Sequence, residues 1–305
     1  MEVPASSANL GAGYDCLGVA LAMTNRIELE VRVWSRGEIE LTVDGEGRNE
    51  LTEDRENRFV QGLEAALRLA LGDLPDGVGW RIGMRNQIPL SRGLGSSAAA
   101  TVGGVLAGNA LAGEPLSRPE LLRLATQIEE HPDNAAAVLL GGFVVSTSTA
   151  AGVEAIRFDA PRELRAVLYI PDLRLSTRDM RAALPASVPL VDAAANLAAV
   201  AVGVAGLATG RHDLLRRLTV DRLHEPYRTA IYPQLPGMVA AAREAGALGA
   251  CLSGAGSTII AFTDSANGAT ALETALTAAA AGLELPGRAR TVGLRNEGAK
   301  VLAQA

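Results

Sequence analysis

The sequence predicts an α+β protein built from two domains. Segments with the alternating pattern of strands occur in pairs separated by helical segments, which disfavours a doubly wound parallel sheet. The chain has 305 residues, about twice the length of a single domain of roughly 150 residues. A polar run at residues 146–152 offers a break, so we expect one domain over residues 1–150 and a second over residues 151–305.

In the first half, apolar residues repeat first with the period of strands and then with that of helices. Residues 25–34 and 39–43 alternate apolar and polar side chains, which predicts two half-buried antiparallel strands. Ser117 followed by Glu120 marks the start of a helix. The other expected elements are a helix at residues 57–71, a strand at 80–84, a loop at 87–95, a helix at 96–111 and a strand at 143–148.

The second half contains further strands and several helices. The strands are expected near residues 155–158 and 164–170, and the helices near 177–184, 191–208, 213–218 and 238–245. A strand–turn–strand around residues 253–257 precedes a long helix and a terminal strand. The most apolar stretches, 193–208 and 271–283, are alanine-rich and interrupted by glycine or acidic residues, so we expect packed helices rather than membrane spans.

The composition excludes several classes of protein. The formal net charge of −6 disfavours nucleic acid and anionic membranes as partners. Of the 28 basic residues only Lys300 is a lysine, which excludes P-loop proteins, protein kinases and Schiff-base enzymes. The two cysteines and three histidines lack the spacing of a structural zinc site. The first residues lack the basic and apolar regions of a signal peptide, and we expect a cytoplasmic protein.

One glycine-rich loop between a predicted strand and a predicted helix has the features of an anion site. Glycines let the main chain approach a phosphate, and the first amides of the helix point toward its charge. The alternative is an ordinary capped helix start. The segment, called the phosphate loop below, consists of Pro89, Leu90, Ser91, Arg92, Gly93, Leu94, Gly95, Ser96, Ser97, Ala98 and Ala99.

Two other glycine-rich segments, residues 3–18 and 252–258, are each as compatible with a tight turn as with a site. A dinucleotide site in the first is disfavoured because it lacks a third glycine at the required offset. In their order and spacing, however, the three segments together resemble the three motifs of the GHMP kinase superfamily. Within it, residues 6–11, 129–134, 176–185 and 221–228 most resemble the homoserine kinase family, and the resemblance covers essentially the whole chain.

The resemblance implies a fold and a reaction. It implies an N-terminal ribosomal-protein-like α+β domain, a C-terminal ferredoxin-like α+β domain and a homodimer. The implied reaction is ATP-dependent phosphorylation of the side-chain hydroxyl of L-homoserine in threonine biosynthesis. The alternatives are another small-molecule kinase of the superfamily, such as a mevalonate or diphosphocytidyl-methylerythritol kinase, and a non-catalytic ligand-binding member.

The resemblance also implies roles for residues around ATP and Mg²⁺. The phosphate loop would hold the phosphates, and Ser97 and Glu129 would be the metal ligands, with Glu130 as the alternative one residue along. Asn57 would recognise the adenine edge or, equally, cap a helix. Arg92, the one cation inside the loop, would either act on the phosphates or be exposed to solvent.

The acceptor requires partners for a carboxylate, an ammonium and a hydroxyl. Arg181 and Arg228 match the substrate arginines of the family, with Arg178 in reserve, because a guanidinium binds a carboxylate through two parallel hydrogen bonds. Asp15 and Asn9 suit the ammonium and the hydroxyl, and the resemblance makes His131 a pocket contact.

For the chemical step, the resemblance assigns Asn134 to substrate orientation, together with Asp15 and Arg181. A loose transition state makes a general base unnecessary, although Asp133 could serve if the register shifts by one residue. Tyr14 replaces a phenylalanine common in the first motif, which we expect to be conservative. His212 and His224 are expected to be surface or structural residues.

Overall fold

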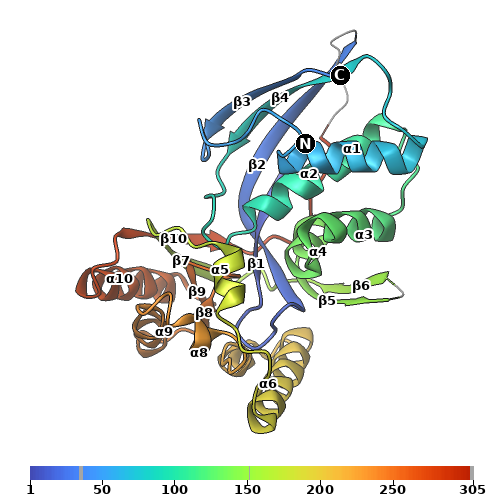
Figure 1. The fold of residues 1–305 in the computed structure, drawn as a ribbon. Helices are drawn as coiled ribbons and strands as arrows, with labels where there is room; N and C mark the ends of the chain where they lie inside the picture. Colours follow the sequence, from blue (N-terminus) through green and yellow to red (C-terminus); the bar gives the residue numbers. More distant parts are fainter. Residues whose placement is uncertain (34–36, 151, 303–305) are drawn as a thin grey trace.

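The computed structural model describes residues 1–33, 37–150 and 152–302 (Figure 1). Trp34, at the end of the strand predicted over residues 25–34, lies outside this part, as does residue 151 at the predicted domain boundary. The first sheet has the order β3-β4-β2-β5-β6, with β1 paired along β2. Its strands are β1 (Glu2–Ala8), β2 (Leu17–Val33), β3 (Ile39–Gly45), β4 (Val78–Asn86), β5 (Phe143–Thr149) and β6 (Gly152–Phe158).

The predicted antiparallel pairing of the strands at 25–34 and 39–43 is wrong. β4 lies between β2 and β3, antiparallel to β2 and parallel to β3. The reason is the connection between β3 and β4, which contains the helix α1 (Arg58–Leu71). A crossover of this kind returns the chain in the same direction, as parallel neighbours require.

Helices cover one face of this sheet (Figure 1). They are α1, α2 (Ser96–Leu111), α3 (Arg118–Glu129) and α4 (Pro132–Leu140). α1 and α2 pack so closely that a Cβ at Gly104 would lie 2.8 Å from Leu63 N. The small residues of α2 therefore permit a close helix–helix contact.

The second sheet is antiparallel, with the order β10-β7-β9-β8. Its strands are β7 (Arg165–Pro171), β8 (Gly249–Leu252), β9 (Ile259–Thr263) and β10 (Gly287–Gly293), and the long helices α9 (Leu235–Glu244) and α10 (Ala266–Gly282) pack against it. A helical segment joins β7 to β8, and α10 joins β9 to β10, which is the ferredoxin-like connectivity. The α+β fold with a ferredoxin-like second domain is thus confirmed.

Sheet pairing locates the change from the first sheet to the second. The predicted break at residue 150 falls between β5 and β6, which pair with each other in the first sheet. β7 is the first strand of the second sheet. By this criterion the change lies between Phe158 and Arg165.

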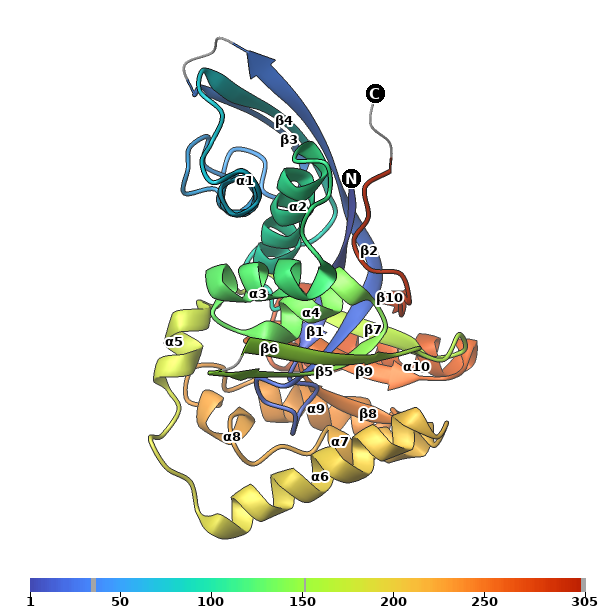
Figure 2. The same ribbon diagram turned by 90° about the vertical axis from the view of Figure 1, so that its right-hand side faces the viewer.

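Between β7 and β8 the chain forms α5 (Thr177–Ala182), α6 (Leu190–Ala208), the 3₁₀ helix His212–Leu214, α7 (Leu215–Leu218), α8 (Glu225–Arg228) and then α9. The expectation that α6 is a packed helix is wrong for most of its surface. α6 lies at the edge of the molecule beside α7 (Figure 2). One face packs on α7, but Leu190, Val191 and Leu197 are 84%, 67% and 72% exposed. α6 is long and apolar enough to cross a membrane, and 22% of it is buried inside the protein.

Candidate active site

The three glycine-rich segments meet at one place, which we call the motif junction. Ser253 Oγ donates its one hydrogen to the Gly93 carbonyl over 2.6 Å, and it therefore accepts the hydrogen bond of 2.9 Å that it shares with Ser7 Oγ. Three backbone hydrogen bonds of 3.1 Å complete the junction, from Gly254 N to Ala8 O, from Thr258 N to Arg92 O and from Ser6 N to Leu94 O. Segments separated by up to about 250 residues thereby hold the phosphate loop in one conformation.

Two glycines of the phosphate loop are required by this close approach. Both have positive φ angles, +73° at Gly93 and +70° at Gly95. A Cβ at Gly93 would lie 2.9 Å from Gly256 N and closer still to Ser253 O, and one at Gly95 would meet Ser6 Oγ. No other residue fits here without moving the loop.

The start of α2 presents amides and hydroxyls toward the same place. Ala99 N donates the first hydrogen bond of the helix, to Gly95 O over 2.8 Å. The amides before Ala99 therefore have no acceptor within the helix. Such amides, together with the helix dipole, favour an anion. The structure therefore differs from the prediction at Ala99, whose buried amide is already used inside the helix.

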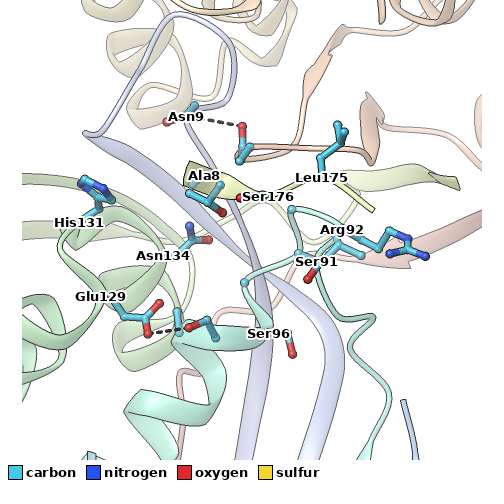
Figure 3. A pocket seen from close by; sticks show the side chains of 18 of the residues that line it. Ala8, Asn9, Ser91, Arg92, Ser96, Glu129, His131, Asn134, Leu175 and Ser176 are labelled. Carbon is cyan, nitrogen blue, oxygen red and sulfur yellow. Dashed lines mark hydrogen bonds between the residues drawn. The ribbon is translucent and has the colours of Figure 1, made fainter. Parts of the chain in front are cut away.

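Ser97 and Glu129 lie together at the edge of this site. Ser97 Oγ donates to Glu129 Oε1 over 2.8 Å, and Thr101 Oγ1 donates to the same oxygen over 2.6 Å (Figure 3). Glu130 ends α3 in the left-handed conformation and lines a different cavity. Hydroxyl and carboxylate oxygens suit Mg²⁺, so Ser97 and Glu129 fit the metal. The described residues contain no cluster of three or more His, Cys, Asp or Glu that could hold a metal unaided.

A cavity of about 470 Å³ opens beside the motif junction. It is lined by most of the predicted site residues: Asn9, Pro89, Ser91, Arg92, Gly93, Leu94, Gly95, Ser96, Ser97, Ala98, Glu129, His131, Asn134, Arg181 and Arg228. Leu90 and Asn57 line a second cavity of about 300 Å³ instead. The two cavities share Ser91, Ser96 and Ser97, so the start of α2 lies between them.

Asn57 caps α1, as one of its two predicted roles requires. Its Oδ1 accepts a hydrogen bond from Phe59 N over 3.0 Å, and its Nδ2 donates to Thr52 O over 3.0 Å. The side chain nevertheless borders the second cavity, so capping and ligand contact are compatible.

Arg92 has a structural role that the sequence did not predict. Its guanidinium donates to three backbone carbonyls, those of Pro171, Leu90 and Asp172, over 2.7 to 3.1 Å. Arg92 thereby ties the phosphate loop to the end of β7. Its side chain also borders the cavity (Figure 3), and the guanidinium keeps two further N–H donors, so its contact with a phosphate stays a prediction.

The predicted acceptor residues gather at the other end of the cavity. Arg181 Nη2 and Nη1 donate to the two carboxylate oxygens of Asp15 over 2.6 and 3.0 Å. His131 Nδ1 lies 3.9 Å from Asp15 Oδ2, and burial lowers the pKa of this histidine. Asn9 Nδ2 donates to Gly254 O over 3.0 Å, while its Oδ1 accepts from Asp15 N (Figure 3).

Arg228 is almost completely buried, with 1% of its surface exposed. Its Nη1 donates to Gly254 O over 3.0 Å, and its Nε donates to Met180 O over 3.3 Å. Among the described residues it has no carboxylate within 4.0 Å. A buried guanidinium that borders a cavity and lacks a counter-ion favours an anionic ligand there.

Asn134 and Asp133 stand between the two ends. Asn134 Oδ1 accepts from Ser6 Oγ over 2.8 Å, which leaves its Nδ2 as the donor for a ligand. Asp133 is buried, and burial raises its pKa to about 7. Its Oδ1 accepts from Asn134 N over 2.7 Å.

Sequence reasoning missed three residues that contact the site. Thr101 shares Glu129 with Ser97, and its position one helical turn after Ser97 was the available signal. Tyr14 receives a hydrogen bond from Arg181, so its hydroxyl has a function that phenylalanine cannot supply. His224, expected to be a surface or structural residue, is completely buried and bonded to Arg228. His224 is the N-cap of α8, four residues before Arg228, and this spacing alone does not identify the contact.

Comparisons with known proteins agree with this geometry. The model for the GHMP kinases N terminal domain matches residues 57–142, and the model for the GHMP kinases C terminal domain matches residues 204–282. The homoserine kinase of Moorella thermoacetica is 42% identical over 262 residues, which are 86% of each chain. The chain belongs to the homoserine kinase family of the GHMP kinases. The homoserine kinase of Caldicellulosiruptor bescii is 40% identical, over 87% of this chain and 84% of that protein.

Solved structures agree with this assignment. The homoserine kinase from Cytophaga hutchinsonii has a TM-score of 0.86 at 30% identity, covering 99% of this chain and 96% of that one. Leishmania major mevalonate kinase has a TM-score of 0.70 at 16% identity, covering 98% of this chain and 96% of that one, and shows a shared fold alone. The resemblance seen in the sequence is thus confirmed for this GHMP kinase.

The close contact at Gly93 predicts a large loss of stability on substitution. Alanine in the left-handed conformation costs about 1–2 kcal/mol. At Gly93 the added methyl group also displaces the Ser253 segment, for a further cost of about 1–3 kcal/mol. Gly113 has a similar φ of +84° and nothing within 4 Å of an added Cβ. Urea unfolding of G93A and G113A should therefore show a clearly larger loss for G93A, and equal losses would contradict the contact.

Proposed function

We propose that this GHMP kinase transfers the γ-phosphoryl group of ATP to the side-chain hydroxyl of L-homoserine, giving O-phospho-L-homoserine for threonine biosynthesis. The observation that carries the proposal is the arrangement of charges in one cavity. Arg181 and Arg228 line the cavity at one end, with Asp15 bonded to Arg181 behind the lining, and the first amides of α2 lie at the other end. An α-amino acid and a polyphosphate match these two ends.

The acceptor end suits a zwitterion because its charged groups already form a pair. In the structure Arg181 and Asp15 neutralise each other through two hydrogen bonds. A carboxylate that binds Arg181 displaces Asp15, and an ammonium on the same molecule then supplies the partner that Asp15 loses. Arg228 provides a second cation for the carboxylate, and Asn9 and His131 lie within the same wall.

The nucleotide end suits ATP with Mg²⁺. The phosphates would lie on residues 89–98, and the nucleoside would extend past Ser96 into the second cavity beside Asn57. Ser97 and Glu129 would hold Mg²⁺, which neutralises phosphate charge when it is bound. Thr101 keeps the Glu129 carboxylate oriented toward Ser97.

For the chemical step, these residues act mainly by position. Asn134, fixed by Ser6, directs its Nδ2 toward the acceptor, and Asp15 and Arg181 hold the amino acid. A loose phosphoryl-transfer transition state needs little proton removal before bond cleavage. We therefore assign no general base.

A coupled assay of ADP release tests the reaction directly. L-homoserine, R-mevalonate and a panel of sugars are offered with MgATP at equal concentrations. We expect turnover with L-homoserine and negligible turnover with mevalonate, which has no ammonium for Asp15. Lack of turnover with L-homoserine would overturn the proposal.

The bidentate geometry of Arg181 makes a prediction for the acceptor. R181K should raise the KM for homoserine roughly tenfold or more, because lysine cannot form two parallel hydrogen bonds. The KM for ATP should stay nearly unchanged. R216K is the control, since Arg216 on α7 is exposed and does not line the cavity. An equal effect in both variants, or weaker ATP binding in R181K, would show that Arg181 is misassigned.

The Ser97 hydroxyl makes a prediction for the metal. S97A should lower kcat/KM for MgATP roughly 10–100-fold and shift the Mg²⁺ requirement upward, with little change in thermal unfolding. S97T keeps a hydroxyl and should be less affected. A Mg²⁺ titration that is identical for S97A and the unchanged chain would contradict the ligand assignment.

We also propose a cytoplasmic homodimer, with α6 as the contact between subunits. Leu190, Val191 and Leu197 are exposed on this helix, and its one charged residue is Asp192. Small side chains along α6 allow a second copy of the helix to approach closely. Cys16 and Cys251 are both free thiols, as in a reducing compartment.

Light scattering tests this contact. The unchanged chain should have twice the 31.5 kDa mass of one chain, and L197E should have the mass of one. V220E, which changes an exposed residue outside α6, is the control. A single-chain mass for the unchanged protein would overturn the homodimer.

A further inference from the structure

The orientation of Arg228 is set by three fixed acceptors. Both hydrogens of its Nη1 are used, one toward Gly254 O over 3.0 Å and one toward His224 Nδ1 over 2.9 Å. The Nε hydrogen is directed at Met180 O. The two hydrogens of Nη2 are therefore the donors that remain for a carboxylate in the cavity.

His224 can accept from Arg228 only in one form of its ring. Its Nε2 lies 2.7 Å from Gly11 O, which can only accept, so Nε2 carries the hydrogen. Burial lowers the pKa of His224 to about 4, so the ring is neutral at physiological pH and Nδ1 keeps its lone pair. The ring thus connects the first motif to Arg228 through two directional hydrogen bonds.

Tyr14 lies against both arginines. Its ring centroid is 5.3 Å from Arg181 Cζ and 5.7 Å from Arg228 Cζ, and its hydroxyl accepts from Arg181 Nη1 over 2.5 Å. The His224 ring is 5.2 Å away from the Tyr14 ring. An aromatic face attracts cations, so Tyr14 offsets the repulsion between two guanidinium groups that face one ligand.

We propose that Tyr14 and His224 are positioning residues that hold Arg181 and Arg228 in the geometry that binds the acceptor carboxylate. His224 fixes the plane of Arg228, and Tyr14 fixes the separation of the two arginines and one donor of Arg181. This inference rests on the proposed function, because it takes an amino acid as the acceptor. Neither residue contacts the phosphoryl group, so their effect is confined to acceptor binding.

Two substitutions of His224 separate its two hydrogen bonds. The amide oxygen of H224N can occupy the place of Nδ1 and accept from Arg228, whereas the amide nitrogen of H224Q can occupy the place of Nε2 and donate to Gly11 O. We expect H224Q to raise the KM for homoserine roughly tenfold, and H224N to raise it much less. The KM for ATP and kcat should change less than twofold in both.

Y14F provides a second test in which folding is preserved, since only a hydroxyl is removed. We expect a rise of roughly fivefold in the KM for homoserine, the value of one hydrogen bond, with the KM for ATP unchanged. H212Q, a histidine variant away from the cavity, is the control and should match the unchanged chain.

The outcomes distinguish this inference from the proposed function. Unaltered homoserine KM values in Y14F and H224Q, in an enzyme that phosphorylates homoserine, would overturn the positioning role alone. A larger rise in the homoserine KM in H224N than in H224Q would also overturn it. So would a fall in kcat together with a similar rise in the KM values for homoserine and ATP and a lower unfolding temperature, because that pattern indicates a structural role. Lack of turnover by the unchanged chain would remove both proposals.

Discussion

The contact between the backbone of Gly93 and the Ser253 segment is the constraint on which the site depends. It joins a loop of the first domain to a turn of the second, and the first motif is bonded to both. The contact leaves no space for a Cβ at Gly93, where an added methyl group would meet the backbone of Ser253 and Gly256. The amides at the start of α2 are consequently fixed before a ligand arrives, which spares the enzyme the entropy of ordering them.

The cavity is lined by arginines and by no lysine, since Lys300 is the one lysine in the sequence. Three of the four arginines that line the cavity are already held by the protein: Arg92 by carbonyls, Arg181 by Asp15 and Tyr14, and Arg228 by Gly254 and His224. A planar guanidinium with several donors can be fixed on one side and still offer donors on the other. Lysine has a single flexible ammonium, so it cannot be fixed by the protein on one side while it binds a ligand on the other. The site therefore combines fixed cations at the acceptor end with neutral amides at the phosphate end.

The sequence predicted the parts of this structure that depend on local pattern. Apolar periodicity predicted α1 and a run of small residues predicted α2, both nearly to the residue, and Ser117 with Glu120 predicted the start of α3. The order of the strands could not be predicted from the sequence. The alternating pattern in β3 shows that one face of this strand is buried, but it does not show which strand lies next to it. The apolar composition of α6 likewise indicated a buried surface without indicating how much of it this chain covers. His224 acquires its partners only when the fold brings Gly11 beside α8, so no local pattern could assign it.

The pairing of β1 has a consequence for how the protein is made. β1 lies at the start of the chain, yet Glu2 forms a bridge with Lys300, and the residues after it are bonded to the turn at 253–258. The chain is synthesised from its amino end, so these partners emerge long after β1. The first sheet can assemble early around β2, but β1 reaches its final set of bonds only after residues 253–258 and Lys300 have been synthesised. The catalytic cleft is thus completed late in the folding of each molecule.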